Sequence, residues 1–111
     1  MVLVIAFDGE ASPSFAYMDA MIAAGKAGWD PVALLLDLRK LRYEWGDEMG
    51  RTLSDAKASG FERQLPLAVV VSELNRAGLT SLIRDELFGK PEQWLCDSLE
   101  AALAMLDLAK P

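Results

Sequence analysis

The sequence predicts an α/β domain in which four apolar strands alternate with four helices. The first observation behind this prediction is the run Val32–Leu38, which is almost wholly apolar and follows the turn residues Gly28, Asp30 and Pro31. A run of this length between turn signals is typical of a strand buried on both faces of a parallel sheet. The second observation is that three further apolar runs are each followed by a stretch with helical spacing. The third is size: 111 residues, 52% apolar and 25% charged, are expected to form one domain over residues 1–111.

The first strand and helix are predicted in the N-terminal quarter of the chain. Val2–Phe7 is apolar and rich in β-branched residues, and Asp8-Gly9 ends it. Ser12-Pro13 then offers a capping hydroxyl followed by a proline at the first helical position. Gly28 is expected to end this helix. Its apolar face is predicted to hold Phe15, Met18, Met21, Ile22 and Gly25.

Val32–Leu38 is the predicted second strand, and a polar connection is expected from Arg39 to Trp45. Asp47 is placed as the cap of the second helix, which Gly60 ends. The apolar stripe predicted for this helix consists of Met49, Leu53 and Ala56.

The second half of the chain repeats the alternation twice. Leu67–Val71 is the third predicted strand, and the third helix is expected over Glu73–Phe88 with Leu79, Leu82, Ile83 and Leu87 inward. The fourth strand is predicted over Gln93–Cys96. Asp97 and Glu100 resemble a capping box at the start of a last helix that reaches Leu108 and carries Leu99, Leu103 and Leu106 inward. Repeated βα units imply parallel pairing and right-handed crossovers.

Composition narrows the classes of function. A net charge of −6 and a pI near 4.5 argue against binding to nucleic acid or to an anionic membrane surface, which both need an excess of lysine and arginine. The single cysteine, Cys96, cannot form an intramolecular disulfide, and the N-terminal apolar run lacks the basic start and the length of a signal or a membrane span. We therefore expect a cytoplasmic protein without stable membrane insertion.

Several kinds of chemistry find no matching motif. The chain has no histidine, so the commonest general base and metal ligand are both missing. Gly9 and Gly46 are isolated and do not form a phosphate-binding loop, and Cys96 is expected to be a small buried residue. No cofactor and no metal ion are expected. A receiver domain is rejected because only one predicted helix separates the strands that end near Asp8 and Asp37.

The carboxyl ends of the predicted strands are where ligands of parallel sheets gather. Asp8 and Asp37 end neighbouring strands, where two carboxylates could bind Mg²⁺ or share a proton. The alternative is that each only ends a strand or caps a helix. The polar residues predicted at these ends are Asp8, Glu10, Asp37, Arg39, Ser72, Asn75, Asp97 and Ser98.

The connection from Arg39 to Asp47 combines basic and aromatic residues, which protein interfaces favour as anchors. It is predicted to be an interaction edge. The alternative is that Leu41 and Trp45 pack under the second helix while the basic residues are solvated. The candidate residues of this edge are Asp37, Arg39, Arg42, Tyr43, Trp45 and Asp47.

The chain resembles the SpoIIAA-like superfamily, in particular its bacterial STAS/SEC14-type branch. The resemblance rests on Asp37-Leu38-Arg39 with Leu41 and Tyr43, on Trp45-Gly46, on Phe61-Glu62-Arg63 leading into Ala68-Val69-Val70, and on the segment 97–103. It implies a four-turn βα superhelix whose parallel strands follow one another in sequential order. In sporulation-type members an Asp-Ser-Gly turn follows the second strand, and a partner kinase phosphorylates its serine. The matching position here holds Trp45-Gly46, so the resemblance implies a fold and a binding role without that phosphorylation switch.

Three functions compete on these grounds. The first is a non-catalytic regulatory or interaction module that binds a protein partner or a second copy of itself through the candidate edge. The second is a small-molecule or lipid-binding module whose apolar pocket would draw on Met18, Met21 and Leu53. The third is an enzyme that uses Asp8 and Asp37, which requires a raised pKa on one of them.

Overall fold

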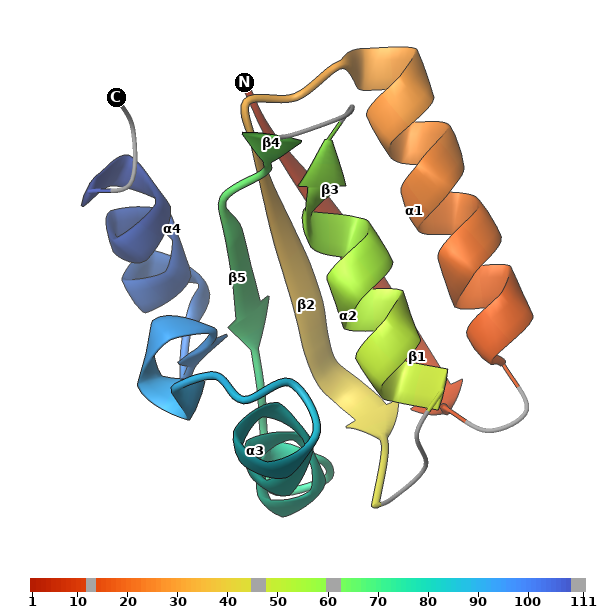
Figure 1. Cartoon of the computed structure of the whole chain (residues 1–111), viewed down its shortest axis with the longest axis vertical. Coiled ribbons are helices and arrows are strands. Elements are labelled where there is room, and N and C mark those ends of the chain that lie inside the picture. Colours follow the sequence, from red (N-terminus) through yellow and green to blue (C-terminus); the bar gives the residue numbers. More distant parts are fainter. Residues whose placement is uncertain (12–13, 45–47, 60–62, 109–111) are drawn as a thin grey trace.

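The computed structural model describes residues 1–11, 14–44, 48–59 and 63–108 (Figure 1). Helices and strands alternate along the chain as the sequence predicts. The elements are β1 (Val2–Glu10), α1 (Phe15–Trp29), β2 (Ala33–Arg42), α2 (Glu48–Lys57), β3 (Ala58–Ser59), β4 (Arg63–Gln64), β5 (Leu67–Val70), α3 (Arg76–Asp85), the 3₁₀ turn η1 (Pro91–Gln93), β6 (Leu95–Cys96) and α4 (Leu99–Leu108).

The main sheet has four parallel strands in the order β1-β2-β5-β6, which is the order of the chain. The predicted α/β fold, a parallel sheet in sequential order with helices packed on it, is confirmed. A short antiparallel pair, β3 and β4, sits between α2 and β5 and has no counterpart in the prediction.

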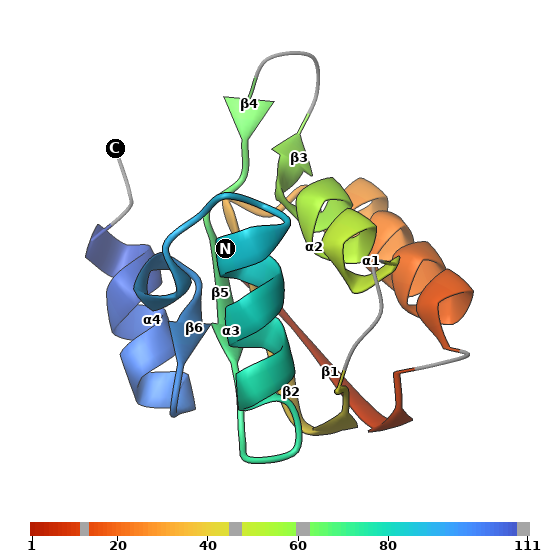
Figure 2. The same cartoon turned by 60° about the horizontal axis from the view of Figure 1, so that its bottom comes forward.

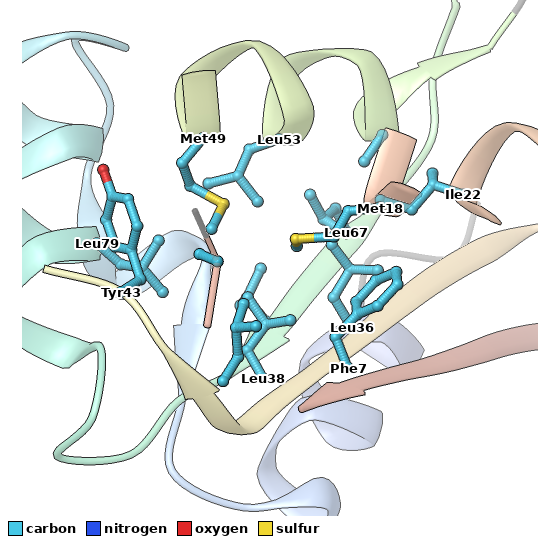
Figure 3. Close-up of a cluster of buried hydrophobic side chains, with 14 of the residues drawn as sticks. Phe7, Met18, Ile22, Leu36, Leu38, Tyr43, Met49, Leu53, Leu67 and Leu79 are labelled. Carbon is cyan, nitrogen blue, oxygen red and sulfur yellow. The ribbon is translucent and has the colours of Figure 1, made fainter. Parts of the chain in front are cut away.

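The helices divide between the two faces of the sheet. Residues of α1, α2 and α3 pack with Leu34, Leu36 and Leu38 of β2 in the larger core cluster, while α4 packs with Ala33 and Leu35 in the smaller one. Right-handed crossovers between sequential strands place their helices on one face, whereas α4 follows the last strand and is free of that constraint. Figure 2 shows α1 beside α2, with α4 set apart from both. Figure 3 shows the larger cluster.

β2 is the central strand that the apolar run predicts. Its residues from Ala33 to Leu36 and Leu38 are at most 1% exposed, because helices cover both of their faces. Val32 is 55% exposed and lies before the strand begins.

The first two strands are longer than predicted. After a register shift between Ala6 and Asp8, β1 continues to Glu10 and pairs with the end of β2 at Arg42. The polar connection expected from Arg39 is therefore partly strand. Backbone pairing with β1 makes this segment a strand, and its charged side chains are exposed.

Several smaller predictions were wrong. α3 begins at Arg76 because residues 72–75 form a turn, and residues 91–93 form a 3₁₀ turn, which leaves β6 with two residues. Leu103 and Met21 are 46% and 43% exposed, since α4 buries Ala102 and Leu106 and α1 buries Met18 and Ile22. The predicted caps Ser12 and Asp47 and the helix end Gly60 lie outside the described residues.

No helix in the described part of the chain is long and apolar enough to cross a bilayer.

Lys26 ties α1 to the end of α2. Its Nζ donates to the carbonyl oxygens of Asp55 (2.7 Å), Ala56 (3.2 Å) and Ala58 (2.5 Å), which are among the groups that a helix C-terminus leaves unsatisfied. Desolvation of the ammonium lowers the pKa of Lys26, and Asp55 opposes that shift.

We expect Lys26→Met to lower the free energy of unfolding by about 1–2 kcal/mol, because a charged donor leaves three carbonyls at a helix end. Urea denaturation of both proteins measures the difference. Lys90→Met, which removes an exposed lysine elsewhere, is the matched control and should leave stability within about 0.5 kcal/mol of wild type. Equal stability of the two variants would contradict this role for Lys26.

Candidate functional site

An open cleft of about 390 Å³ lies where β1 and β2 end and α1 begins. This is the edge of a parallel sheet at which ligands usually bind. Its polar groups come from three elements: Asp8 of β1, Ser14 before α1, and Asp37, Arg39 and Lys40 of β2. Tyr17 and Met18 of α1 complete one wall, with Ala6, Phe7 and Leu41.

The pairing of β1 with β2 is irregular beside this cleft. The register shift between Ala6 and Asp8 interrupts the regular pairing, and Gly9 takes a φ of +88°, a conformation that glycine adopts without a steric penalty. The chain then returns to the sheet, where the Ala11 N–H donates to the carbonyl of Arg42 (2.9 Å) and Ala11 is buried. α1 consequently starts beside the strand ends.

Asp37 and Arg39 form a fixed pair in the cleft. Arg39 Nε donates to Asp37 Oδ1 (2.9 Å) and Arg39 Nη2 to Oδ2 (2.8 Å), the bidentate geometry that guanidinium and carboxylate favour. The Arg39 hydrogen bonds hold the pKa of Asp37 below its usual value, against the opposing effect of partial burial, and the Lys40 charge adds to the lowering. Asp37 thus stays ionised, and it positions a guanidinium that is itself 45% exposed.

Two polar side chains, Ser72 and Asn75, hydrogen-bond to the backbone at the end of β2. Asn75, which is 1% exposed, donates through Nδ2 to the carbonyls of Leu38 (2.5 Å) and Leu41 (2.8 Å) and accepts from the Ser72 N–H (3.1 Å). Ser72 Oγ donates to the carbonyl of Arg39 (2.8 Å). These hydrogen bonds therefore fix the backbone before and after Arg39 and Lys40. Ser72 and Asn75 are predicted at a strand end, and in the structure their side chains hydrogen-bond to the backbone of the neighbouring strand, β2.

Tyr17 gives the cleft an aromatic wall. Its side chain is 62% exposed, and its ring meets Phe7 edge-on at 6.3 Å with an angle of 79° between the ring planes. A ring that is braced on one side and open on the other offers contact area at a low entropic cost. Tyr17 and Ser14 are not among the predicted site residues, because helical spacing identifies the buried face of α1 and says nothing about its flanks.

The four candidate edge residues that the structure describes do not lie together. Asp37 and Arg39 line the cleft. Arg42 is exposed beyond it and pairs with Glu10 (3.3 Å). Tyr43 is 4% exposed and lies in the larger core cluster, among the side chains of Figure 3, so its ring is not available to a partner. Trp45 and Asp47 lie outside the described residues.

The geometry bears on the other two candidate functions. Asp8 and Asp37 do line one cleft, but the pKa of Asp37 is lowered, whereas a shared proton needs a raised pKa. Among residues 1–11, 14–44, 48–59 and 63–108, no three acidic or cysteine side chains gather as a metal site would require. Met18 and Leu53, offered as the lining of an apolar pocket, are at most 1% exposed in the packed core.

Comparison of the chain with protein-family models, with curated proteins and with solved structures gives no significant match.

Proposed function

We propose that this chain is a non-catalytic interaction module that binds a partner protein through the strand-end cleft. The observation that carries the proposal is the Asp37–Arg39 pair, which holds an exposed guanidinium at the mouth of the cleft. Arginine and tyrosine are the residue types most enriched among the energetically dominant contacts of protein interfaces, and Arg39 and Tyr17 line the same cleft.

The chemistry of the cleft favours an acidic or carbonyl-rich segment of the partner. Asp37 engages two of the five guanidinium N–H groups of Arg39, and the others suit a carboxylate or a backbone carbonyl. Lys40 adds a second positive charge at the same strand end. The chain as a whole has a net charge of −6, so local complementarity at the cleft has to outweigh the repulsion between the rest of the chain and an acidic partner.

A second candidate function is the binding of a small polar molecule. Its support is the volume of about 390 Å³, which lies in the usual range of about 300–1,000 Å³ for small-molecule sites. The lining combines the carboxylates of Asp8 and Asp37 with the cations of Arg39 and Lys40, so it favours a small polar molecule over a lipid.

Kinship with the STAS/SEC14-type branch of the SpoIIAA-like superfamily is also a proposal, supported by the sequential parallel sheet. So is a cytoplasmic location, supported by the single cysteine.

The test begins with cross-linking in the organism of origin, identification of the captured proteins by mass spectrometry, and calorimetry with the purified partner. We expect Arg39→Ala to weaken binding by about tenfold or more, since the guanidinium contact is lost. A small polar ligand would instead be detected by NMR, through shifts of the Asp8, Ser14 and Lys40 amides.

Arg84→Ala is the matched control. Arg84 also lies close to a neighbouring aspartate (Asp85, 3.4 Å) and is 62% exposed, but it lies on α3. Its removal should change the affinity by less than about twofold. If Arg39→Ala keeps its melting temperature and still binds like wild type, the cleft is not the binding site.

A further inference from the structure

The outer edge of β1 is open to another strand. β1 ends the sheet on one side with nine residues, whereas β6 ends the other side with only two. Natural edge strands are usually protected by charges, proline or short length. From Val2 to Phe7, β1 has no charged residue and no proline.

The backbone of β1 presents regular hydrogen-bonding groups to this edge. The Met1 carbonyl accepts from the Val32 N–H (2.9 Å), so it points toward β2. Because successive peptide groups of a strand alternate in direction, Leu3 and Ile5 also face β2, while the N–H and C=O groups of Val2, Val4 and Ala6 face outward.

Exposed, uncharged side chains lie beside the open edge on both faces of the sheet. On one face, Val4 is 50% exposed. On the other, the flank of α1 that turns away from α2 holds Tyr17 (62% exposed), Met21 (43% exposed), Ala24 and Gly28. The charged side chains Asp19 and Lys26 lie on the opposite flank, where they bond to Thr52 and to the carbonyls at the end of α2. The edge and this flank of α1 thus form one apolar surface, which we call the β1 surface.

We propose that the β1 surface pairs with the β1 surface of a second copy, so that two four-stranded sheets join into one. A two-fold axis through Val4, perpendicular to the sheet, makes the paired strands antiparallel. Val4 then faces Val4 of the second copy, and Leu3 faces its Ile5, while Val2 faces its Ala6. These five residues of each copy are apolar, and the outward N–H and C=O groups of Val2, Val4 and Ala6 meet those of the second copy in register.

A second copy fits this surface better than a charged partner does. The residues of the β1 surface carry no charge, so the paired strands do not bring like charges face to face, and Asp107 of α4 lies beside this surface at Val2. The surface is small, with Val4, Tyr17 and Met21 as its large exposed side chains, so the pairing is expected to be weak and reversible. The same axis sets the small residues Ala24 and Gly28 of the two α1 helices near each other, which permits a close approach. This inference does not depend on the proposed function, although Tyr17 lies in the β1 surface and also lines the cleft.

Sedimentation equilibrium over a range of concentrations tests the proposal. The wild-type chain should shift from 12.1 kDa toward twice that mass as concentration rises, with little effect of salt. Val4→Lys should raise the dissociation constant by about tenfold or more, since it places two ammonium groups against each other. Phe88→Lys is the control: it puts lysine on another side chain that is 89% exposed, outside the β1 surface, and should leave the dimer intact.

A cysteine cross-link tests the register and still applies if Val4→Lys fails to fold. In the proposed pairing the two Val4 Cα atoms lie about 5.5 Å apart, within disulfide range. Val4→Cys in a Cys96→Ala background should therefore cross-link on mild oxidation, and Phe88→Cys should not. A wild-type chain that stays at 12.1 kDa, a folded Val4→Lys variant that dimerises normally, or a Val4→Cys variant that does not cross-link would each overturn the proposal.

Discussion

Asn75→Ala is expected to lower the free energy of unfolding by about 2–4 kcal/mol, a large effect for a single polar substitution. The side chain satisfies the buried carbonyls of Leu38 and Leu41 and the N–H of Ser72. Alanine leaves all three groups without this partner in a site that is 1% exposed, where water cannot replace it readily. Chemical denaturation with urea measures the loss.

Asn75→Ser separates this role from helix capping. Asn75 stands at the N-cap of α3 but makes no side-chain capping bond. Serine is a good N-cap residue, yet it is too short to reach the β2 carbonyls. Asn75→Ser should therefore be nearly as unstable as Asn75→Ala. A serine variant with wild-type stability would show that capping, and not the link to β2, is what Asn75 provides.

Gly78→Ala should destabilise the fold by about 1–3 kcal/mol, although alanine is the better helix former. A Cβ at this position of α3 would lie 2.7 Å from the Glu44 carbonyl oxygen and 3.0 Å from Tyr43 Cδ2. The oxygen belongs to the backbone that leaves β2, so it cannot move aside like the end of a side chain. The clash would push α3 away from the strand that carries the cleft.

Gly50→Ala makes the same substitution in α2 and should have the opposite sign. Its Cβ would meet Leu82 Cδ1 at 3.6 Å and Leu87 Cδ2 at 3.7 Å, which are ordinary contacts. Helix propensity and a new buried methyl group should then stabilise the protein by up to about 1 kcal/mol. Thermal melts of the two variants, compared with wild type, test this contrast. Two shifts of the same sign would contradict the packing described for α3.

The parts of the fold that the sequence predicts are those set by burial. Val32–Leu38 predicts a central strand because helices on both faces demand apolar residues at successive positions, and within it Ala33 to Leu36 and Leu38 are buried accordingly. The extension of β2 to Arg42 could not be read in the same way, since it depends on pairing with β1 across a register shift. The segment predicted as a connection is therefore partly strand, and the Tyr43 side chain lies in the core.

The candidate site was predictable only in part. Strand-end logic identified Asp37 and Arg39, because the end of an apolar run marks the carboxyl edge of a parallel sheet. Tyr17 and Ser14 line the same cleft because α1 begins beside the strand ends. This placement accompanies the irregular pairing of β1 with β2, and no sequence motif predicts it. The open edge of β1 likewise becomes visible only when the strand order is known.

The most direct test of the central claim, that the strand-end cleft is the binding site, is the hydrogen-exchange footprint of the bound partner on the full chain. Binding should slow exchange at the amides of Asp8, Ser14, Arg39 and Lys40 around the cleft. Protection confined to α3 or α4, with exchange at the cleft unchanged, would contradict the claim.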